Sequence, residues 1–418
     1  MTKHHHTIII GAGLSGLSAA WHLQQQGKTV LVLEASHSVG GRIKTETHAG
    51  FRLDVGFQVL LTHYPEAQKM LDYDALDLKY FDNGALIFNA GSTFSITDPF
   101  RQPATAIKML FSPVGTLKDK ILLAKLLFLL RKKSVHQIFA APETTTALAL
   151  KKAGFSPKII QNFFEPFFRG IFLENTLSTS SRMFEFVLKL FAQGSTAIPN
   201  QGMQAIPHQI AAKLQPDTIV FGKKAMEINE GAVATQDGEI FTAQNIVIAT
   251  QANNPLLKNH EQPHYQAHGS VTNVYFSAEK SPLNAPILAL NAEKNGFVNN
   301  ICVLSDVAPE YAPAGMHLIS VSINGIFDEL DEAELVQRIK SELAVSFGYE
   351  VNTWDLLKIY AIPHALPNQQ TVNNNAEPAQ LQIGENLYKC GDYMLNASIN
   401  AALKVGRQTA ELILKNEN

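Results

Sequence analysis

The pattern of apolar and polar positions at the start of the chain predicts one compact unit. Thr7–Ile10 is a β-branched run of the kind that forms a buried parallel strand. A helical pattern follows over 15–26, Gly27 stands where glycine usually follows a helix, and a second strand is expected over 29–33. Strand, turn, helix and strand in this order predict a βαβ unit.

Further along, the pattern alternates between helical and extended regions. Helices dominate between Pro65 and Leu190, and the pattern predicts them over 104–111, 117–133, 144–153 and 157–168. Strands are expected over 218–221, 225–229, 232–235, 245–249, 271–276, 297–304 and 317–323. One amphipathic helix is expected over 328–347, with Leu330, Leu335, Ile339 and Leu343 on one face. The chain then has a last strand over 387–390 and a last helix over 399–415.

Composition removes several classes of protein. The chain has 418 residues, of which 46% are hydrophobic and 17% charged, and its net charge is −3, so neither whole-chain disorder nor a nucleic-acid partner is expected. Two cysteines, Cys302 and Cys390, can form neither a disulfide framework nor a multi-cysteine zinc site, and they fit a cytoplasmic location. No metal site is expected. The first residues are not expected to form a signal peptide, and the longest apolar stretch, 121–130, is too short to span a membrane.

The turn after the first strand carries the first chemical motif. Gly11, Gly13 and Gly16 form a G-x-G-x-x-G pattern, which allows a tight turn, close approach of the backbone to a pyrophosphate, and close packing of helix on strand. The N-terminus of the helix that follows then directs its free N–H groups at the phosphates. Glu34 ends the second strand, where a carboxylate can accept hydrogen bonds from ribose hydroxyls. These residues predict a dinucleotide site.

The residues after Glu34 indicate which dinucleotide. Ala35 opens a segment that ends in Gly40-Gly41-Arg42, whose guanidinium can bind a phosphate oxygen. This run resembles the superfamily of flavin-containing amine oxidases, phytoene desaturases and protoporphyrinogen oxidases. The run 53–58 is similar to a D-x-G segment of that family and includes Gly56, Phe57 and Gln58.

Three later segments also resemble this family. In the closing turn, Gly391 and Asp392 match the position where a carboxylate meets the ribityl chain of the flavin, and 396–402 resembles a helix start that faces the flavin N1–C2=O edge. The segment 198–207 is similar to the family's P-x-G-G-M-x-x-L-P run. The resemblance implies one FAD, contacted by Gly11, Gly13, Leu14, Ser15, Gly16, Glu34, Ala35, Gly41, Arg42, Gly56, Phe57, Gln58, Ala225, Ala249, Thr250, Gly391, Asp392, Ala397, Ser398 and Ile399.

The chain departs from the amine oxidases at two positions. Asn273 stands where those enzymes carry a lysine, and Ser398 stands where they carry a cage tyrosine. The cysteine of the covalently flavinylated members is also missing, so the resemblance implies non-covalent FAD. Asn273, His364 and Ser398 are pocket candidates, and no catalytic base is assigned.

Two further features bear on the substrate. The segment Phe163–Phe172 holds five phenylalanines, which form either ordinary core or the wall of a cavity for a long apolar substrate. The helix over 117–133 is both apolar and basic, so it is either a packed helix with a solvated basic end or a contact with an anionic membrane surface.

The desaturase-like branch is the closer match, which implies oxidation or desaturation of a hydrophobic, polyene or isoprenoid-like substrate by hydride transfer to flavin N5. An amine oxidase, a protoporphyrinogen-oxidase-like dehydrogenase and a non-redox flavoprotein are the alternatives. A second G-x-G-x-x-G is absent from the sequence, so dioxygen, a quinone or a carrier is the expected electron acceptor.

The expected fold is α/β, with a Rossmann-like FAD-binding domain and an inserted substrate domain of mixed β-sheet and helices. The FAD domain is expected to take residues 1–75, 191–255 and 376–418, and the substrate domain residues 76–190 and 256–375.

Overall fold

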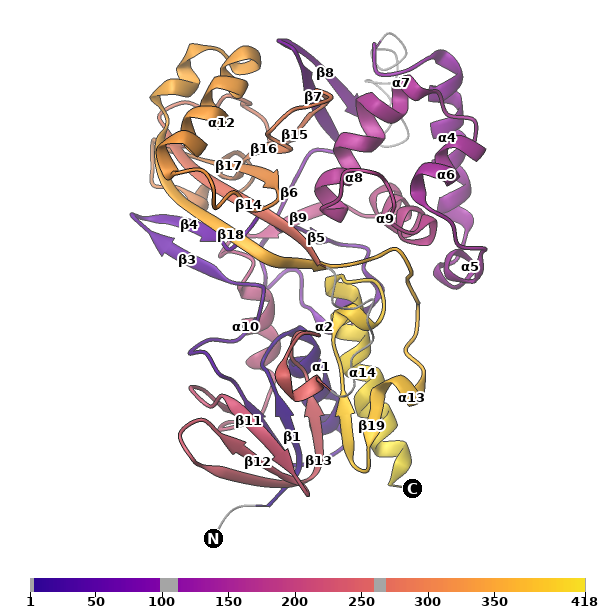
Figure 1. The fold of residues 1–418 in the computed structure, drawn as a ribbon, viewed down its shortest axis with the longest axis vertical. Coiled ribbons are helices and arrows are strands. Elements are labelled where there is room, and N and C mark those ends of the chain that lie inside the picture. Colours follow the sequence, from indigo (N-terminus) through magenta and orange to yellow (C-terminus); the bar gives the residue numbers. More distant parts are fainter. Residues whose placement is uncertain (1–3, 98–111, 259–267, 418) are drawn as a thin grey trace.

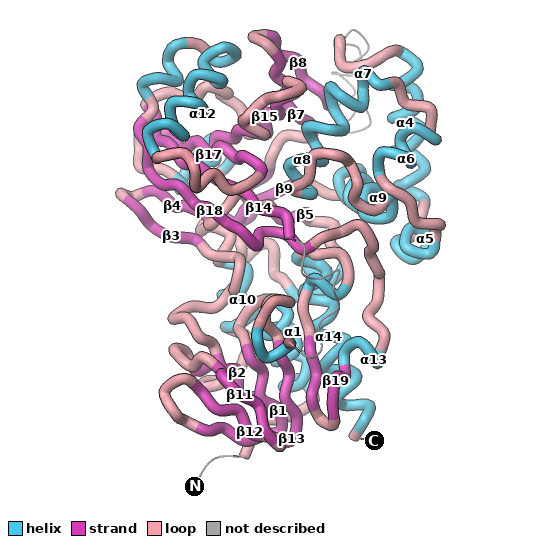
Figure 2. The backbone as a smooth tube through the Cα atoms, in the orientation of Figure 1, coloured by secondary structure: helices cyan, strands magenta, loops and turns pink. Residues whose placement is uncertain are grey.

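The computed structural model describes residues 4–97, 112–258 and 268–417. A parallel sheet and its helices form one end of the molecule, where both described chain ends lie, while a second sheet and a group of helices form the other end (Figure 1). Figure 2 shows the strands gathered into these two separate regions. The helix expected over 104–111 lies outside the described residues.

The first sheet is built around the βαβ unit. Its strand order is β10-β2-β1-β13-β12-β11, and β20 pairs with β13 and β19. Strands β10, β2, β1, β13 and β20 run parallel. The bounds are β1 His5–Ile10, β2 Val30–Leu33, β10 Ile219–Val220, β11 Ala225–Asn229, β12 Ala232–Thr235, β13 Ile240–Ile248, β19 Gln382–Gly384 and β20 Leu387–Lys389.

Two helices pack tightly against each other beside this sheet. They are α1 (Leu14–Gln25) and α14 (Ile399–Asn416). A Cβ atom added to Gly406 would lie 2.3 Å from the backbone oxygen of Ser15. Only glycine therefore allows the middle of α14 to pack this closely on the first turn of α1.

The second sheet has the order β18-β14-β17-β16-β15-β7-β8. The bounds are β7 Gly84–Asn89, β8 Ser92–Thr97, β14 His268–Ala278, β15 Leu288–Asn291, β16 Asn300–Val303, β17 His317–Asn324 and β18 Asp355–Pro367. Helix α12 (Glu332–Phe347) buries Leu335, Ile339 and Leu343 in a core shared with this sheet. The helix was expected to begin at 328, but the capping box of Asp331 and Glu334 starts it at 332 and leaves Leu330 before the helix.

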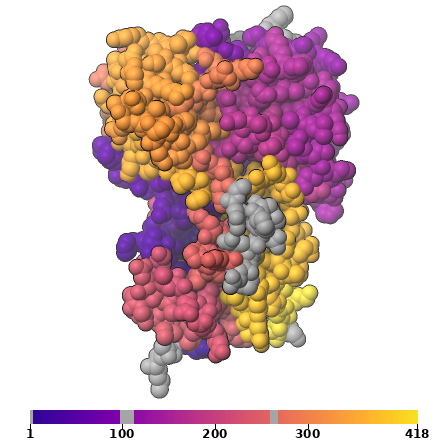
Figure 3. All heavy atoms as spheres, in the orientation of Figure 1, coloured from indigo at the N-terminus to yellow at the C-terminus, as the bar shows by residue number. Residues whose placement is uncertain are grey.

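A group of helices lies beside the second sheet (Figure 1), and in Figure 3 the magenta surface of this segment adjoins the orange surface of later residues. The bounds are α4 Leu117–Lys132, α5 Val135–Ala140, α6 Thr146–Lys152, α7 Pro157–Ile159, η1 Ile160–Phe164, α8 Glu165–Phe172 and α9 Ser181–Gln193. The single helix expected over 157–168 is instead interrupted by the π-helical turn η1. Pro166 lacks an N–H group and cannot donate to the carbonyl four residues earlier, which accounts for the break.

Short elements connect these layers. They are β3 Thr45–His48, β4 Phe51–Asp54, β5 Leu60–Leu61, β6 Leu78–Tyr80, β9 Thr196–Pro199, α2 Pro65–Met70, α10 Ala205–Ala211, α11 Leu304–Val307 and α13 Pro378–Leu381. Strand β9 pairs with both β5 and β6. None of the helices in the described parts of the chain has the length and apolarity that crossing a membrane requires.

The predicted α/β fold class is confirmed. The pattern gave no expectation of β18 or α9. Strand β18 contains Pro363, which usually argues against a strand. Here Gly269 pairs with Leu366 and Val271 with Ile362, so Pro363 lies in a bulge of an edge strand, where its missing N–H group costs no ladder hydrogen bond. The strands of the two sheets come from the segments assigned to the two domains, and the domain boundaries stay a prediction.

Candidate active site

A cavity of about 860 Å³ lies between the two sheets and is lined from both. Its volume is at the upper end of the range for ligand pockets. The predicted FAD residues converge on it: Gly11, Gly13, Leu14, Ser15, Glu34, Ala35, Gly41, Arg42, Gly56, Phe57, Gln58, Ala225, Ala249, Thr250, Gly391, Asp392, Ala397, Ser398 and Ile399. Gly16 is the single predicted member outside the lining.

The glycine turn explains this division. Gly11 has φ +107°, and a Cβ atom there would lie 2.7 Å from the carbonyl oxygen of Ala249. A Cβ atom at Gly16 would lie 2.1 Å from the carbonyl oxygen of Gly11, so Gly16 allows the helix to pack on the turn. A Cβ atom at Gly13 would meet nothing within 4 Å, and Gly13 caps α1 without a side-chain hydrogen bond. The first N–H groups of α1 are therefore available to a phosphate.

Glu34 is held at the end of β2 by three hydrogen bonds. Its Oε2 accepts from the backbone N–H of Ala12 at 2.8 Å, and its Oε1 accepts from the N–H and the hydroxyl of Ser36, both at 2.8 Å. The carboxylate thus lies beside the glycine turn, where a ribose of a bound dinucleotide is expected.

An ion pair joins two distant segments of the lining. Arg42 Nη2 contacts Asp392 Oδ1, and Arg42 Nη1 donates to the carbonyl of Ala365 at 3.3 Å. The amide of Gln58 donates to the carbonyl of Arg42 at 3.0 Å. The G-G-R run, the closing turn and strand β18 are therefore fixed to one another at this wall.

The turn at Gly56 rests on a buried carboxyl group. Asp54 Oδ1 accepts from the hydroxyl of Thr45 at 2.5 Å and from the N–H of Met203 at 3.0 Å, and its Oδ2 accepts from the hydroxyl of Tyr311 at 3.0 Å. Burial raises the pKa of Asp54 to about 6, although these hydrogen bonds oppose the shift. This network ties the segment 198–207, which contains Met203, to the turn at Gly56 in the cavity wall.

Helix α14 begins at the cavity. The hydroxyl of Ser398 accepts from the N–H of Ala401 at 3.0 Å and donates to Asn396 Oδ1 at 2.7 Å. The positive end of this 18-residue helix therefore opens on the site, where it favours an electron-rich ligand edge.

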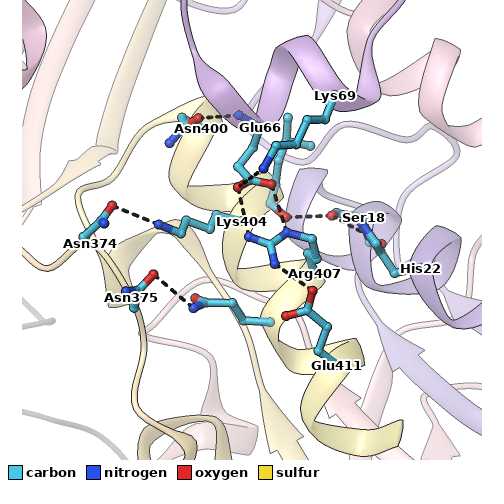
Figure 4. Close-up of polar contacts among 12 residues, drawn as sticks. Ser18, His22, Glu66, Lys69, Asn374, Asn375, Asn400, Lys404, Arg407 and Glu411 are labelled. Atoms are coloured by element: carbon cyan, nitrogen blue, oxygen red, sulfur yellow. Dashed lines mark hydrogen bonds and ion pairs between the residues drawn. The ribbon is translucent and has the colours of Figure 1, made fainter. Parts of the chain in front are cut away.

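A charged cluster behind the cavity anchors this helix to α2 (Figure 4). Arg407 on α14 binds Glu66 with two hydrogen bonds of 3.0 and 2.9 Å, and the backbone N–H of Glu66 donates to Asn400 Oδ1 at 2.9 Å. Lys404 donates to Asn374 Oδ1 at 2.9 Å, and burial lowers its pKa to about 8. The cluster was not predicted, because only the fold brings α2 beside α14.

The other half of the cavity, defined here by lining residues 167–191, 271–324 and 362–369, is apolar or neutral. Apolar lining comes from Phe167, Ile171, Leu173, Met183, Val187, Phe191, Val271, Leu288, Leu290, Ile362, Ala365 and Leu366. Neutral polar lining comes from Asn299, Asn300, Ser322, Asn324 and Gln369. This "substrate half" has no charged side chain among the described residues. In the sequence, these residues appear only as parts of alternating strand patterns and of an aromatic helical segment. Such patterns do not indicate which face of a strand or helix lines the cavity.

Of the three residues predicted to lie in the pocket, only one lines the cavity. Ser398 lines the cavity. Asn273 is fully buried behind the lining, and its Oδ1 accepts from the hydroxyls of Ser320 at 3.2 Å and Ser322 at 2.8 Å. His364 lies on β18, is exposed, and packs its ring against His268 instead of lining the cavity.

The aromatic segment is mostly core. Four of its phenylalanines are buried against one another, and only Phe167 lines the cavity. No residue of α4 is on the lining, because α9 lies between α4 and the cavity.

The glycine turn, Glu34 and the start of α1 lie together at one end of the cavity, as a dinucleotide-binding site requires. Residues 14–414 match the family model described as flavin containing amine oxidoreductase. The chain therefore belongs to this family, a class of FAD-dependent oxidoreductases.

Individual relatives are distant. Protoporphyrinogen oxidase 2 of Arabidopsis thaliana is 26% identical over 164 residues, which are 39% of this chain and 31% of that protein. Phytoene dehydrogenase of Streptomyces griseus is 46% identical over 55 residues, which are 13% of this chain and 11% of that protein. A structure of wild-type putrescine oxidase bound to putrescine superposes with a TM-score of 0.72 at 17% identity, over 99% of this chain and all of that one. These matches support the fold and the family and leave the substrate open.

The lowered pKa of Lys404 predicts a pH effect on stability. The unfolded chain binds more protons than the folded chain between about pH 8 and the ordinary lysine pKa of 10.5, so the free energy of unfolding rises with pH in that window. The Lys404→Met variant should lack this rise in urea denaturation curves taken from pH 7 to 10. Lys415→Met, at an exposed position of the same helix, should keep it, and an unchanged slope in Lys404→Met would contradict the assignment.

Proposed function

We propose that this enzyme oxidises or desaturates an uncharged, largely apolar substrate of the polyene or isoprenoid kind, with FAD held non-covalently. Bound FAD supplies the acceptor for a hydride from a C–H bond. The described residues supply the dinucleotide cradle, the positive start of α14 and an apolar chamber that positions the substrate and excludes water.

The observation that carries this proposal is the division of charge in the cavity. Its charged lining residues come from the end of β2, the G-G-R run and the residues just after it, the segment beside Ala225 and the closing turn. They are Glu34, Arg42, Lys44, Lys223, Lys224 and Asp392. A charged substrate that leaves water needs a compensating partner. The described part of the substrate half offers none, so a neutral substrate fits it best.

The alternative functions fit the substrate half of the cavity less well. An amine oxidase is less well supported, because the positions of that group's lysine and cage tyrosine hold other residues. Asn273 stands at the lysine position and lies behind the cavity lining, and Ser398 stands at the tyrosine position and has no aromatic ring. A porphyrinogen with several carboxylates would need cations that the described substrate half lacks. A non-redox flavoprotein remains the alternative of another class. Dioxygen, a quinone or a carrier remains the proposed electron acceptor.

A peripheral contact with an anionic membrane surface is a second proposal, and the outer face of α4 supports it. Leu117, Ile121, Phe128 and Leu129 are 47–61% exposed there, although they are large and apolar. Exposed Lys118, Lys125 and Lys132 lie among them on the same helix. Exposed apolar side chains interspersed with lysines suit the interface of an anionic bilayer. Since α4 does not line the cavity, this contact would hold the enzyme at the membrane without forming the mouth of the pocket.

The cofactor assignment predicts one non-covalent FAD per chain. Acid precipitation should release yellow FAD into the supernatant, and flavin that stays in the pellet, or FMN in its place, would contradict the prediction. Arg42→Ala should weaken FAD binding by at least about tenfold, because the expected charge-assisted hydrogen bond from the guanidinium to a phosphate oxygen is lost. The exposed Lys415→Ala variant serves as the control and should retain FAD.

The neutral-substrate proposal predicts the order of flavin reduction in anaerobic stopped-flow mixing. A polyene or isoprenoid substrate should bleach the flavin, while benzylamine and putrescine should be at least about a hundredfold slower, because no described group in the chamber compensates an ammonium ion. Rapid bleaching by an amine would restore the amine oxidase reading. If no reductant in a broad panel bleaches the flavin, the non-redox alternative gains support.

The membrane proposal predicts salt-sensitive binding to anionic vesicles, since charges are screened within about 3 Å at 1 M salt. Changing Lys118, Lys125 and Lys132 to glutamate should weaken binding by at least about tenfold while FAD is retained. A control with the same change in charge places glutamate at the exposed Lys280, Lys294 and Lys415, which lie outside α4. Equal loss of vesicle binding in both variants would mean that total charge, and not the face of α4, is responsible.

A further inference from the structure

Two neighbouring strands of the second sheet bring amide and hydroxyl groups to the cavity wall. Asn300 on β16 pairs directly with Ser322 on β17, and the N–H of Asn299 donates to the carbonyl of Ser322 at 2.8 Å. Asn299, Asn300 and Ser322 are only 2%, 5% and 4% exposed, yet all three line the cavity, together with Asn324 at the end of β17. We call these four residues the polar patch.

The amide of Asn299 is fixed in one orientation. Its Oδ1 accepts from Arg169 Nε at 2.7 Å, and Arg169 also donates to the carbonyl of Asn291 at 2.8 Å. The Nδ2 of Asn299 has no hydrogen-bond partner. Because a guanidinium bound to the amide oxygen polarises the whole amide, this Nδ2 is a strengthened donor that lacks an acceptor.

The amide of Asn300 lies beside it. A Cβ atom added to Gly170 of α8 would lie 2.5 Å from the Nδ2 of Asn299 and 3.0 Å from the Nδ2 of Asn300. Both nitrogens are therefore next to a cavity-lining glycine that has no side chain of its own. The Oδ1 of Asn300 also has no partner.

The rest of the polar patch offers acceptors and carries no charge. The hydroxyl of Ser322 donates its hydrogen to Asn273 Oδ1 at 2.8 Å, so its lone pairs remain. The Nδ2 of Asn324 donates to the carbonyl of Arg169 at 3.0 Å, and its Oδ1 has no partner. Asn273 is therefore a positioning residue that sets the direction of the Ser322 hydroxyl.

Buried polar groups without partners are rare in native proteins, and several at one cavity wall indicate a ligand that supplies the missing bonds. We propose that the polar patch binds a neutral hydroxyl group of an otherwise apolar substrate, whose oxygen accepts from the Nδ2 of Asn299 and whose hydrogen is donated to the Oδ1 of Asn300. This inference rests on the proposed function, which supplies the apolar substrate. The apolar remainder would then lie against Phe167, Ile171 and their neighbours.

The test compares two isoprenoids that differ in the oxygen. Farnesol and farnesene are titrated into the FAD-loaded protein in the same nonionic detergent, and binding is followed by the perturbation of the flavin absorption band. Because a site built to hydrogen-bond a hydroxyl discriminates against the analogue that lacks it, farnesol should bind at least about tenfold tighter. The readout is binding and needs no turnover.

Substitutions in the polar patch test whether it causes the preference for farnesol over farnesene. Asn300→Leu and Asn299→Leu should each reduce the preference for farnesol to within about twofold of unity while farnesene binding persists. Asn245→Leu, at a buried asparagine of the first sheet away from the cavity, should keep the preference. Equal affinity of the wild-type protein for the two ligands would overturn the polar-patch inference and leave the apolar-substrate proposal standing. Binding of neither ligand would overturn both.

Discussion

The close approach of three backbone segments at the end of β1 is the constraint on which the rest of the site depends. Gly11 contacts the carbonyl of Ala249, Gly16 contacts the carbonyl of Gly11, and Gly406 contacts the carbonyl of Ser15. Any side chain at these positions would separate β13, α1 and α14. Because they meet, the N-termini of two helices open on one cavity, and the anchoring pair of Glu66 and Arg407 holds the second helix there.

The cavity combines two environments that favour different chemistry. On the side of the first sheet, charged groups and free N–H groups suit phosphates and sugar hydroxyls. On the side of the second sheet, aromatic and aliphatic side chains surround a few neutral amides. Low polarity strengthens each hydrogen bond in that half, and it also makes each unpartnered amide costly. The same low polarity therefore disfavours both an uncompensated charge and an unpartnered amide in this half of the cavity.

The two halves are connected by specific contacts and not by proximity alone. Arg42 reaches the closing turn through Asp392 and the edge strand β18 through Ala365. Asp54 accepts from Tyr311, and its backbone carbonyl accepts from Tyr275 of β14. These bonds hold the second sheet in a fixed position over the dinucleotide cradle, which a reaction between two bound molecules requires.

The sequence by itself determined the fold class and identified the residues from which a dinucleotide site is predicted. The glycine turn, Glu34, Arg42 and Asp392 act through local backbone geometry and through motifs whose spacing is visible in the chain, and the structure brings them to one cavity. Only the tertiary structure decided which side chains line the substrate half of the cavity. Strand alternation does not show that Asn300 lies opposite Ser322, that Phe167 and not its four neighbours meets the cavity, or that Pro363 lies in a bulge of an edge strand. These facts depend on pairings between residues far apart in the chain, and no local pattern of hydrophobicity encodes such a pairing.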